Sequence, residues 1–263
     1  MSLVKASLQG LGVWDEVRAN LDEFAVELYG DEQPISAITW NPPVNGTVYG
    51  VLLNYQGQYD KFREQFHQPP YKQPPKAPIL YIKPANTLTG CNCPIPLPAG
   101  EERLEMGAAF AVVIGKTATR VKAEHALDYI EGYTIANDVS IPHESIYRPA
   151  IKQKARDGFC PIGPWIVSKD DIADTGQLNI RVYINGELKQ ENNTRNMIRS
   201  IPTLIEDITD FMTLNRGDVL LAGVPEGAPL VGKGDRVRIE ISGIGALENT
   251  IAPEEGGSQN EKS

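Results

Sequence analysis

The sequence of 263 residues has few cysteines and histidines, three of each. Three cysteines, an odd number, do not suggest a disulfide framework, and the pair Cys91 and Cys93 lacks the further ligands of a zinc site. The longest strictly apolar run, Ala108 to Ile114, is far shorter than a membrane-spanning helix. The N-terminus also lacks the apolar core and small-residue cleavage site of a secretory signal. These absences predict a cytoplasmic protein that does not contact a membrane.

Basic residues are outnumbered by acidic ones. The 25 Lys and Arg against 34 Asp and Glu give a formal net charge of −9, and no block of clustered Lys and Arg occurs. A surface that binds the nucleic-acid backbone needs such clusters, so no nucleic-acid partner is expected. The glycine-rich patterns GxGxxG and GxxxxGK[ST] are absent too, so the sequence gives no support for nucleotide binding.

Short segments of alternating apolar and polar residues indicate β-strands. Residues 178–184 and 236–241 alternate in this way. Between the first of them and residues 187–190, Asn185 and Gly186 tolerate positive φ angles and suit a tight hairpin turn. The segment 108–114 is apolar on both faces, which is typical of a central strand.

Two segments predict helices. Apolar residues in 198–212 recur at spacings of three and one, and Ser200 and Pro202 stand where an N-cap and a first-turn proline belong. Residues 123–130 predict a shorter helix that ends near Gly132. Many short strands with few helices predict a β-dominated α+β fold and exclude alternating βαβ units.

Several motifs follow one another in a characteristic order. They are Leu53-Asn54-Tyr55, Tyr81-Ile82-Lys83-Pro84, residues 111–116, residues 132–140, residues 182–187 and residues 214–227. Together they resemble the fumarylacetoacetate hydrolase family over residues 47–252. The resemblance implies a mixed β-sandwich or β-roll, with an N-terminal segment, residues 1–46, partly packed on this core. Residues 253–263 contain no apolar side chain that could be buried and predict a disordered tail.

The resemblance implies a site for Mg²⁺, which polarises a 2-oxo acid so that an enolate can form. Its ligands would be a Glu-x-Glu pair on one face of a strand and a later Asp. Here the Glu positions hold Gly107 and Ala109, and the Asp position keeps Asp138. Glu105 has the right parity but could bind only if the strand register slipped. No metal or other cofactor is therefore expected in this chain, although active family members use Mg²⁺. Restoring both carboxylates should introduce binding if the backbone is otherwise intact.

Two further groups that the resemblance implies are missing. Gln58 replaces a histidine that accepts a proton, and an amide cannot act as a general base at neutral pH. Val224 stands where the family usually presents a threonine hydroxyl. Both changes concern the same implied pocket as the missing carboxylates.

Other implied site residues are retained. Lys154 matches a lysine beside the metal and substrate, and Lys83 matches the lysine of an FxKP-like strand, so catalytic roles are implied for Lys154, Asp138 and Lys83. The implied substrate-binding residues are Arg148, Gln58, Asn54, Tyr147 and Asp157. A guanidinium such as that of Arg148 can pair with a carboxylate through two hydrogen bonds.

Structural roles remain open for the same residues. Asp138 could cap a turn, and Arg148 could form a surface ion pair. Lys154 could pair with Asp157 inside the protein, and Asn54 could satisfy the backbone of a turn.

The resemblance implies two activities in 4-hydroxyphenylacetate catabolism. 5-Oxopent-3-ene-1,2,5-tricarboxylate loses CO₂ to give 2-hydroxyhepta-2,4-diene-1,7-dioate, which then isomerises to its 2-oxo form. The expected small-molecule partner is thus a 2-oxo di- or tricarboxylic acid, and the expected assembly is a homodimer or a hetero-oligomer with a metal-bearing paralogue. The alternative is a catalytically silent, metal-free subunit that stabilises that paralogue.

Overall fold

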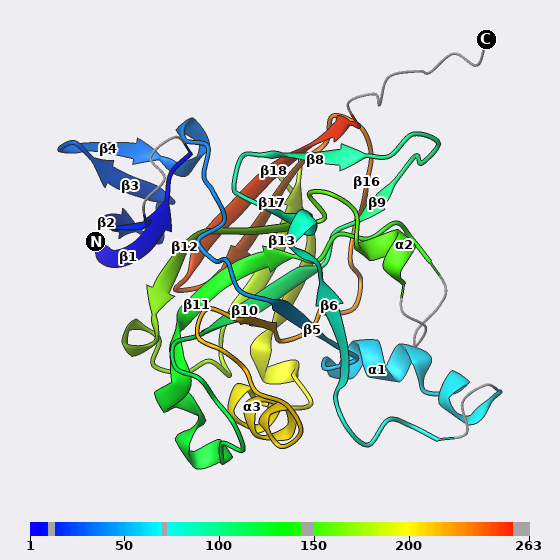
Figure 1. Ribbon diagram of the computed structural model, residues 1–263. Helices are drawn as coiled ribbons and strands as arrows, with labels where there is room; N and C mark the ends of the chain where they lie inside the picture. The colour runs from blue at the N-terminus through cyan, green and yellow to red at the C-terminus, as the bar shows by residue number, and fades with distance from the viewer. Residues whose placement is uncertain (10–13, 70–72, 144–149, 255–263) are drawn as a thin grey trace, which may run out of the picture.

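The computed structural model describes residues 1–9, 14–69, 73–143 and 150–254, and strands dominate this part of the chain (Figure 1). The larger sheet has the strand order β4 (Asp31–Pro34), β3 (Ala25–Leu28), β2 (Trp14–Asn20), β1 (Ser2–Ser7), β12 (Cys160–Ser168), β11 (Ile130–Asn137), β10 (Ala108–Ile114), β15 (Val219–Leu221), β5 (Val48–Leu52) and β6 (Ile79–Lys83), with β7 (Leu88–Thr89) beside β12. The second sheet has the order β14 (Glu187–Asn193), β13 (Asn179–Ile184), β17 (Arg236–Ile241), β18 (Gly245–Pro253) and β8 (Pro94–Leu97), and β16 (Leu230–Val231) pairs with β9 (Leu104–Glu105). This architecture confirms the β-dominated α+β prediction.

Helices are short and lie at the margins of the sheets (Figure 1). Within the described residues, the α-helices are α1 (Gln56–Phe62), α2 (Ile151–Lys154) and α3 (Ile201–Thr209). The 3₁₀ helices there are η1 (Ile35–Ala37), η2 (Gln65–His67), η3 (Ala85–Thr87), η4 (Ala123–Tyr129), η5 (Lys169–Asp171) and η6 (Thr194–Asn196). None of the helices in this part of the chain has the length and apolar character that crossing a bilayer takes.

The strand predictions agree with the structure. All residues of β10 are buried, and the strand lies between β11 and β15, as its continuous apolar sequence predicts. β13 and β14 form the predicted hairpin, and Asn185 and Gly186 between them have φ angles of 53° and 84°. The isoleucines and valine of β13 face the core, while Asn179 and Arg181 are exposed.

The two helix predictions need correction. Residues 123–129 form the 3₁₀ helix η4 instead of an α-helix, and Ile130 already begins β11, because it continues into a buried strand. Ser200 is the N-cap of α3, as predicted, because its Oγ accepts the N–H of Thr203 at 3.4 Å, but the helix ends at Thr209, before the predicted end at residue 212. Ile198 lies before this cap and is 40% exposed, so the apolar stripe is shorter than predicted.

The N-terminal segment adds both strands and core side chains to the fold. β1 pairs antiparallel with β12, so β1 to β4 extend the larger sheet, on the upper left in Figure 1. The fully buried ring of Trp40 meets Trp165 of β12 edge to face, with 5.8 Å between ring centroids. Edge-to-face contacts of this kind add to the stabilisation from burial.

The predicted C-terminal tail begins later than expected. β18 continues through Pro253, which pairs with Leu97 of β8. The boundary at residue 253 was wrong because this pairing uses backbone groups and needs no apolar side chain. Residues 255–263 of the predicted tail lie outside the described residues.

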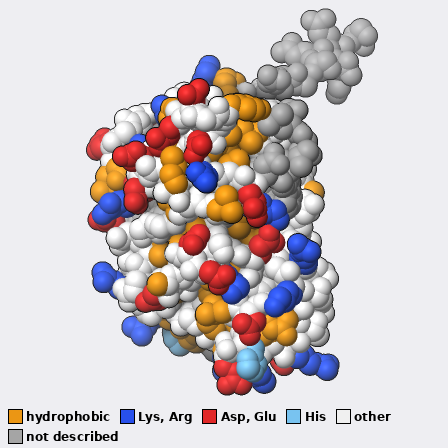
Figure 2. Space-filling view, turned by 90° about the vertical axis from the view of Figure 1, so that its left-hand side faces the viewer, with side chains coloured by type: hydrophobic (Ala, Val, Ile, Leu, Met, Phe, Trp, Pro, Cys, Tyr) orange, Lys and Arg blue, Asp and Glu red, His pale blue; other side chains and the backbone are white. Residues whose placement is uncertain are grey.

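The surface offers no charged area of one sign on the face seen in Figure 2. Acidic and basic side chains are interspersed there, with apolar side chains between them (Figure 2). This distribution agrees with the absence of basic clusters in the sequence.

Candidate active site

Asp138 is a buried carboxylate at the end of a central strand. It directly follows the last residue of β11, and its backbone N–H donates to the carbonyl oxygen of Gly107 at 2.8 Å. Its side chain is only 1% exposed. A buried carboxylate is costly unless opposite charge and hydrogen bonds compensate it, so its neighbours decide what it can do.

Two lysine side chains provide this compensation. The Nζ atom of Lys83, the last residue of β6, lies 2.8 Å from Oδ1 of Asp138. The Nζ atom of Lys154, the last residue of α2, lies 2.8 Å from Oδ2. Three residues that sequence reasoning selected, from distant parts of the chain, thus meet in one cluster, which we call the lysine–aspartate cluster.

The two lysines differ in how far they are engaged. Lys83 is completely buried, and its ammonium group also donates to the carbonyl oxygens of Val139 at 3.0 Å and Lys154 at 2.9 Å. Lys83 thus combines two hydrogen bonds to backbone oxygens with an ion pair to Asp138. The side chain of Lys154 is 17% exposed. Lys154 is therefore the member of the cluster that a ligand can reach.

Tyr81 completes the cluster, and sequence reasoning did not select it. Its hydroxyl donates to Oδ2 of Asp138 at 2.5 Å, and its ring centroid lies 5.4 Å from the Nζ of Lys154. The ring crosses β5 at Gly50, where a Cβ atom would lie only 2.0 Å from the Cζ of Tyr81. The spacing of Tyr81 and Lys83 could have revealed it, because alternate residues of a strand share one face.

The contacts explain the direction of each pKa shift. Burial alone would raise the pKa of Asp138, but the charges of Lys154 and Lys83 outweigh it and hold the pKa well below its usual range. Burial and the neighbouring Asp138 raise the pKa of Tyr81 well above its ordinary value, so its hydroxyl keeps its proton. Burial lowers the pKa of Lys83, while Asp138 opposes that shift. With both ammonium groups charged, two cations surround one carboxylate.

The residues present do not fit the Mg²⁺ that the family resemblance implies. Ala108 pairs with Asn137, so Gly107 lies opposite Asp138 without any register slip toward Glu105. A Cβ atom at Gly107 would lie 2.6 Å from the carbonyl oxygen of Asp138 and 3.0 Å from Cγ2 of Val224. A glutamate side chain therefore has no room there unless the backbone moves, so restoring both carboxylates would require such a movement.

The donor set is equally unsuited to a divalent cation. Mg²⁺ needs several converging oxygen ligands, yet both oxygens of Asp138 already face ammonium groups. Among the described residues, no group of three or more His, Cys, Asp or Glu side chains could hold a metal ion. The described residues therefore do not provide a site at which a metal ion could take part in the reaction.

Asn54 is tied to the backbone and lies outside the lysine–aspartate cluster. Its Nδ2 donates to the carbonyl oxygens of Ala222 at 2.8 Å and Arg199 at 3.1 Å, and its Oδ1 accepts the N–H of Arg199 at 3.0 Å. The side chain is buried. These contacts support the structural role that the sequence left open for Asn54.

Asp157 and Gln58, two other implied residues within the described part of the chain, form no hydrogen bond or ion pair with the cluster there. Asp157 accepts a hydrogen bond from Nδ2 of Asn86 at 2.6 Å, whereas Lys154 pairs with Asp138. Gln58 is half-buried in α1. Tyr147 and Arg148 lie outside the described residues.

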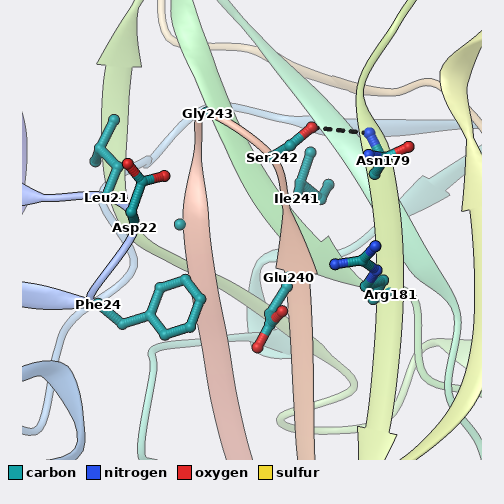
Figure 3. A pocket seen from close by; sticks show the side chains of 10 residues that line it. Leu21, Asp22, Phe24, Asn179, Arg181, Glu240, Ile241, Ser242 and Gly243 are labelled. Atoms are coloured by element: carbon teal, nitrogen blue, oxygen red, sulfur yellow. Dashed lines mark hydrogen bonds between the residues drawn. The ribbon is translucent and has the colours of Figure 1, made fainter.

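Two cavities among the described residues lie away from the cluster. One, of about 180 Å³, has Leu21, Asp22 and Phe24 on one side and β13 and β17 on the other (Figure 3). The other, of about 300 Å³, is lined by residues that include Lys116, Glu131 and Arg216. The first is smaller than typical small-molecule sites, and neither contains a residue of the lysine–aspartate cluster.

Comparisons with known proteins agree with the geometry. Residues 47–252 match the family model of the C-terminal domain of fumarylacetoacetate (FAA) hydrolase. A relative from Escherichia coli, the 4-hydroxyphenylacetate degradation bifunctional isomerase/decarboxylase, is 46% identical over 211 residues, which cover 80% of this chain and 48% of the relative. The chain thus spans about half the length of this curated relative.

Solved structures show the same fold. The 2-hydroxyhepta-2,4-diene-1,7-dioate isomerase from Mycobacterium marinum has a TM-score of 0.76 and 28% identity, covering 97% of this chain and 100% of that chain. Maleylpyruvate hydrolase from Sphingobium, solved in complex with manganese(II) and pyruvate, has a TM-score of 0.76 and 23% identity, covering 96% and 100%. The latter likeness shows the fold alone, and the manganese belongs to that protein.

Proposed function

The chain belongs to the fumarylacetoacetate hydrolase family, and on this premise we propose that it decarboxylates 5-oxopent-3-ene-1,2,5-tricarboxylate, isomerises 2-hydroxyhepta-2,4-diene-1,7-dioate, or does both. The names of the relatives from E. coli and M. marinum support this class of substrate. Because the chain spans about half of the E. coli relative, the assignment of either reaction to this chain is part of the proposal.

The observation that carries the proposal is the convergence of Lys83, Lys154 and Tyr81 on the buried carboxylate of Asp138. With both lysines charged, the cluster has an excess of one positive charge. An anionic 2-oxo acid is attracted to it, and the attraction is stronger at a partly buried site than in bulk water. We assign ligand contact to Lys154, since it is the partly exposed lysine.

The chemistry requires positive charge near the carbonyl oxygen. When CO₂ leaves, or when a proton leaves carbon, electrons move toward that oxygen and an enolate develops. Donors that are already in place stabilise such a charge without reorganisation. The charge of Lys154 would stabilise the developing enolate, and Asp138, itself paired with Lys83, would hold Lys154 in position. The hydroxyl of Tyr81 would be a proton donor at the same site.

Four residues that lack the chemical groups implied by the family resemblance favour a second function, that of a catalytically silent subunit. Gly107, Ala109, Gln58 and Val224 stand where the family resemblance implies two metal ligands, a proton acceptor and a hydroxyl. Their loss suits a catalytically silent subunit that stabilises a metal-bearing paralogue. Both functions are compatible with a homodimer or a hetero-oligomer, and we propose that the chain forms such an assembly.

An assay of the purified chain distinguishes the two functions. The chain is incubated with the tricarboxylate and with the dienedioate, alone and with a metal-bearing paralogue, in the presence of either EDTA or Mg²⁺. Turnover by the chain alone that EDTA leaves unchanged supports an active subunit. Turnover only in the mixture, unaffected by Lys154→Ala in this chain, supports the silent subunit.

A further inference from the structure

Decarboxylation of a 2-oxo acid needs a group that accepts the electron pair of the breaking carbon–carbon bond. A metal ion on the carbonyl oxygen is one such group, but the donor set around Asp138 does not fit one. A protonated imine formed by a lysine amine is another, because its nitrogen takes up the electrons in the same way. The lysine–aspartate cluster contains two lysines that could be considered for this role.

Exposure selects between these lysines. Lys83 is completely buried, donates hydrogen bonds to two carbonyl oxygens and forms an ion pair with Asp138. Lys154 is 17% exposed and has one close polar partner among the described residues, Oδ2 of Asp138. Lys154 is therefore the lysine of the pair whose side chain is partly open to solvent, whereas Lys83 has no free approach.

The groups that imine formation requires converge on a single atom. Oδ2 of Asp138 lies 2.8 Å from the Nζ of Lys154 and accepts the hydroxyl of Tyr81 at 2.5 Å. An amine that adds to a carbonyl must give up protons, and the carbonyl oxygen must gain protons to leave as water. At rest the carboxylate of Asp138 is ionised and the hydroxyl of Tyr81 is protonated, and the hydrogen bonds that join them to the amine provide a path along which these protons can move during the reaction. Lys83, on the other oxygen, places a second cation beside the same carboxylate.

We propose that Lys154 forms an imine with the 2-oxo group of its substrate, in place of metal coordination. This inference rests on the proposed function. The ammonium group of Lys154 first gives up a proton, and its Nζ then bonds to the carbonyl carbon. The carbonyl oxygen leaves as water with that proton and a second one from the amine, so that a protonated imine remains. The electron pair of the bond to the departing CO₂ then moves into the conjugated system and toward the imine nitrogen, which gives an enamine. Protonation on carbon and addition of water to the C=N bond release the 2-oxo product and the free amine, so no oxidant or reductant is needed.

Borohydride trapping tests the inference. The full chain is incubated with pyruvate, as the simplest 2-oxo acid, and then reduced with sodium borohydride. Reduction fixes an imine as a stable secondary amine. We expect the intact mass to rise by the mass of pyruvic acid less one oxygen atom, and peptide mapping to place the adduct on Lys154.

Two matched variants make the test specific. Lys154→Arg keeps a positive charge beside Asp138 but cannot form an imine, so it should lose the adduct and at least about 100-fold of the decarboxylation rate. Lys152→Arg changes an exposed lysine of the same helix and should retain the adduct and the rate. Circular dichroism and thermal melting confirm that each variant is folded.

The outcomes separate this inference from the proposed function. Decarboxylation by the parent without any adduct would overturn the imine and leave the proposed function standing. An adduct confined to Lys154 without turnover of the tricarboxylate would support the imine, although the proposed function would fail. An adduct that persists in Lys154→Arg, or that spreads over surface lysines such as Lys152, would overturn the imine, as would the absence of both adduct and turnover.

Discussion

The carbonyl oxygen of Asp138 lies 2.6 Å from the position that a Cβ atom on Gly107 would occupy. Gly107 directly precedes β10 and Asp138 directly follows β11, so the two residues lie opposite each other at the edge of the candidate site. Backbone, rather than a flexible side chain, fills the space where a glutamate side chain would have to begin. The two glutamates of the metal-binding pair are thus missing from the sequence, and the local packing leaves no room for the first of them at residue 107.

We predict that Gly107→Ala destabilises the fold by about 1–3 kcal/mol, because forcing atoms into filled space shifts the backbone. Equilibrium unfolding in urea measures the change. Gly232→Ala is the matched control, since its nearest contact, at 3.4 Å, is an ordinary one. Equal stability of Gly107→Ala and the parent would contradict the packing argument.

Isothermal titration of the double variant Gly107→Glu with Ala109→Glu should show no Mg²⁺ binding.

Asp138→Asn should be among the most destabilising single changes at the site. It leaves the ammonium groups of Lys83 and Lys154 beside a neutral amide, and breaking a buried ion pair in this way typically costs about 3–5 kcal/mol. Chemical denaturation at neutral pH measures the loss. Asp157→Asn, at an exposed carboxylate, should stay within about 0.5 kcal/mol of the parent. A similar small effect at residue 138 would show that the cluster contributes little to the fold.

The sequence predicts the strands better than the helix limits, for physical reasons. Alternation over residues 178–184 and a continuous apolar run over 108–114 each have one stable arrangement in a sheet. Ser200 reveals where the helix begins, but the apolar stripe over residues 198–212 extends beyond both ends of α3, because apolar residues are also buried or exposed outside the helix. In the same way, apolar spacing in residues 123–129 does not distinguish a 3₁₀ helix from an α-helix.

Part of the candidate site follows from the sequence, and part depends on tertiary contacts. Motif resemblance selects Lys83, Asp138 and Lys154, which do meet. It does not select Tyr81, although Tyr81 and Lys83 share one face of a strand. The contact of Tyr81 with Asp138 also requires the bare backbone of Gly50 on the neighbouring strand, which depends on the tertiary structure. Lack of room at residue 107 likewise depends on how two strands lie side by side.

The three thiols should differ sharply in reactivity. Burial raises the pKa of Cys91 and of Cys160 to about 12, so both remain protonated at pH 8, and the thiolate is the reactive form. Cys93 is partly exposed. We expect a disulfide reagent at pH 8 to modify only Cys93 rapidly in the native protein, and all three thiols in guanidinium. Rapid modification of Cys160 in the native protein, located by peptide mapping, would contradict the burial of this thiol.

Tyr81→Phe removes the hydroxyl that donates to Asp138 and keeps the ring beside Lys154. We expect a stability loss of about 1 kcal/mol and a fall in turnover of about 10-fold or more, since a proton donor at the site is lost. Unfolding in urea and initial rates measure the two effects. Tyr183→Phe, which changes a tyrosine ring under Arg238 in the second sheet, should leave the rate unchanged. An unchanged rate for Tyr81→Phe would remove Tyr81 from the chemistry.

Lys154→Ala should weaken the binding of a dicarboxylic 2-oxo acid by about tenfold or more, equivalent to about 1.4 kcal/mol. The reason is that Lys154 is the partly exposed cation of the cluster, and its charge acts where little water screens it. Titration calorimetry with 2-oxoglutarate as the probe measures the affinity, with Lys152→Ala as the control on the same helix. Thermal melting checks that the fold survives, since Lys83 still pairs with Asp138 in the variant. If Lys154→Ala binds the probe as tightly as the parent does, the cluster is not a ligand site, and the silent-subunit function is the better one.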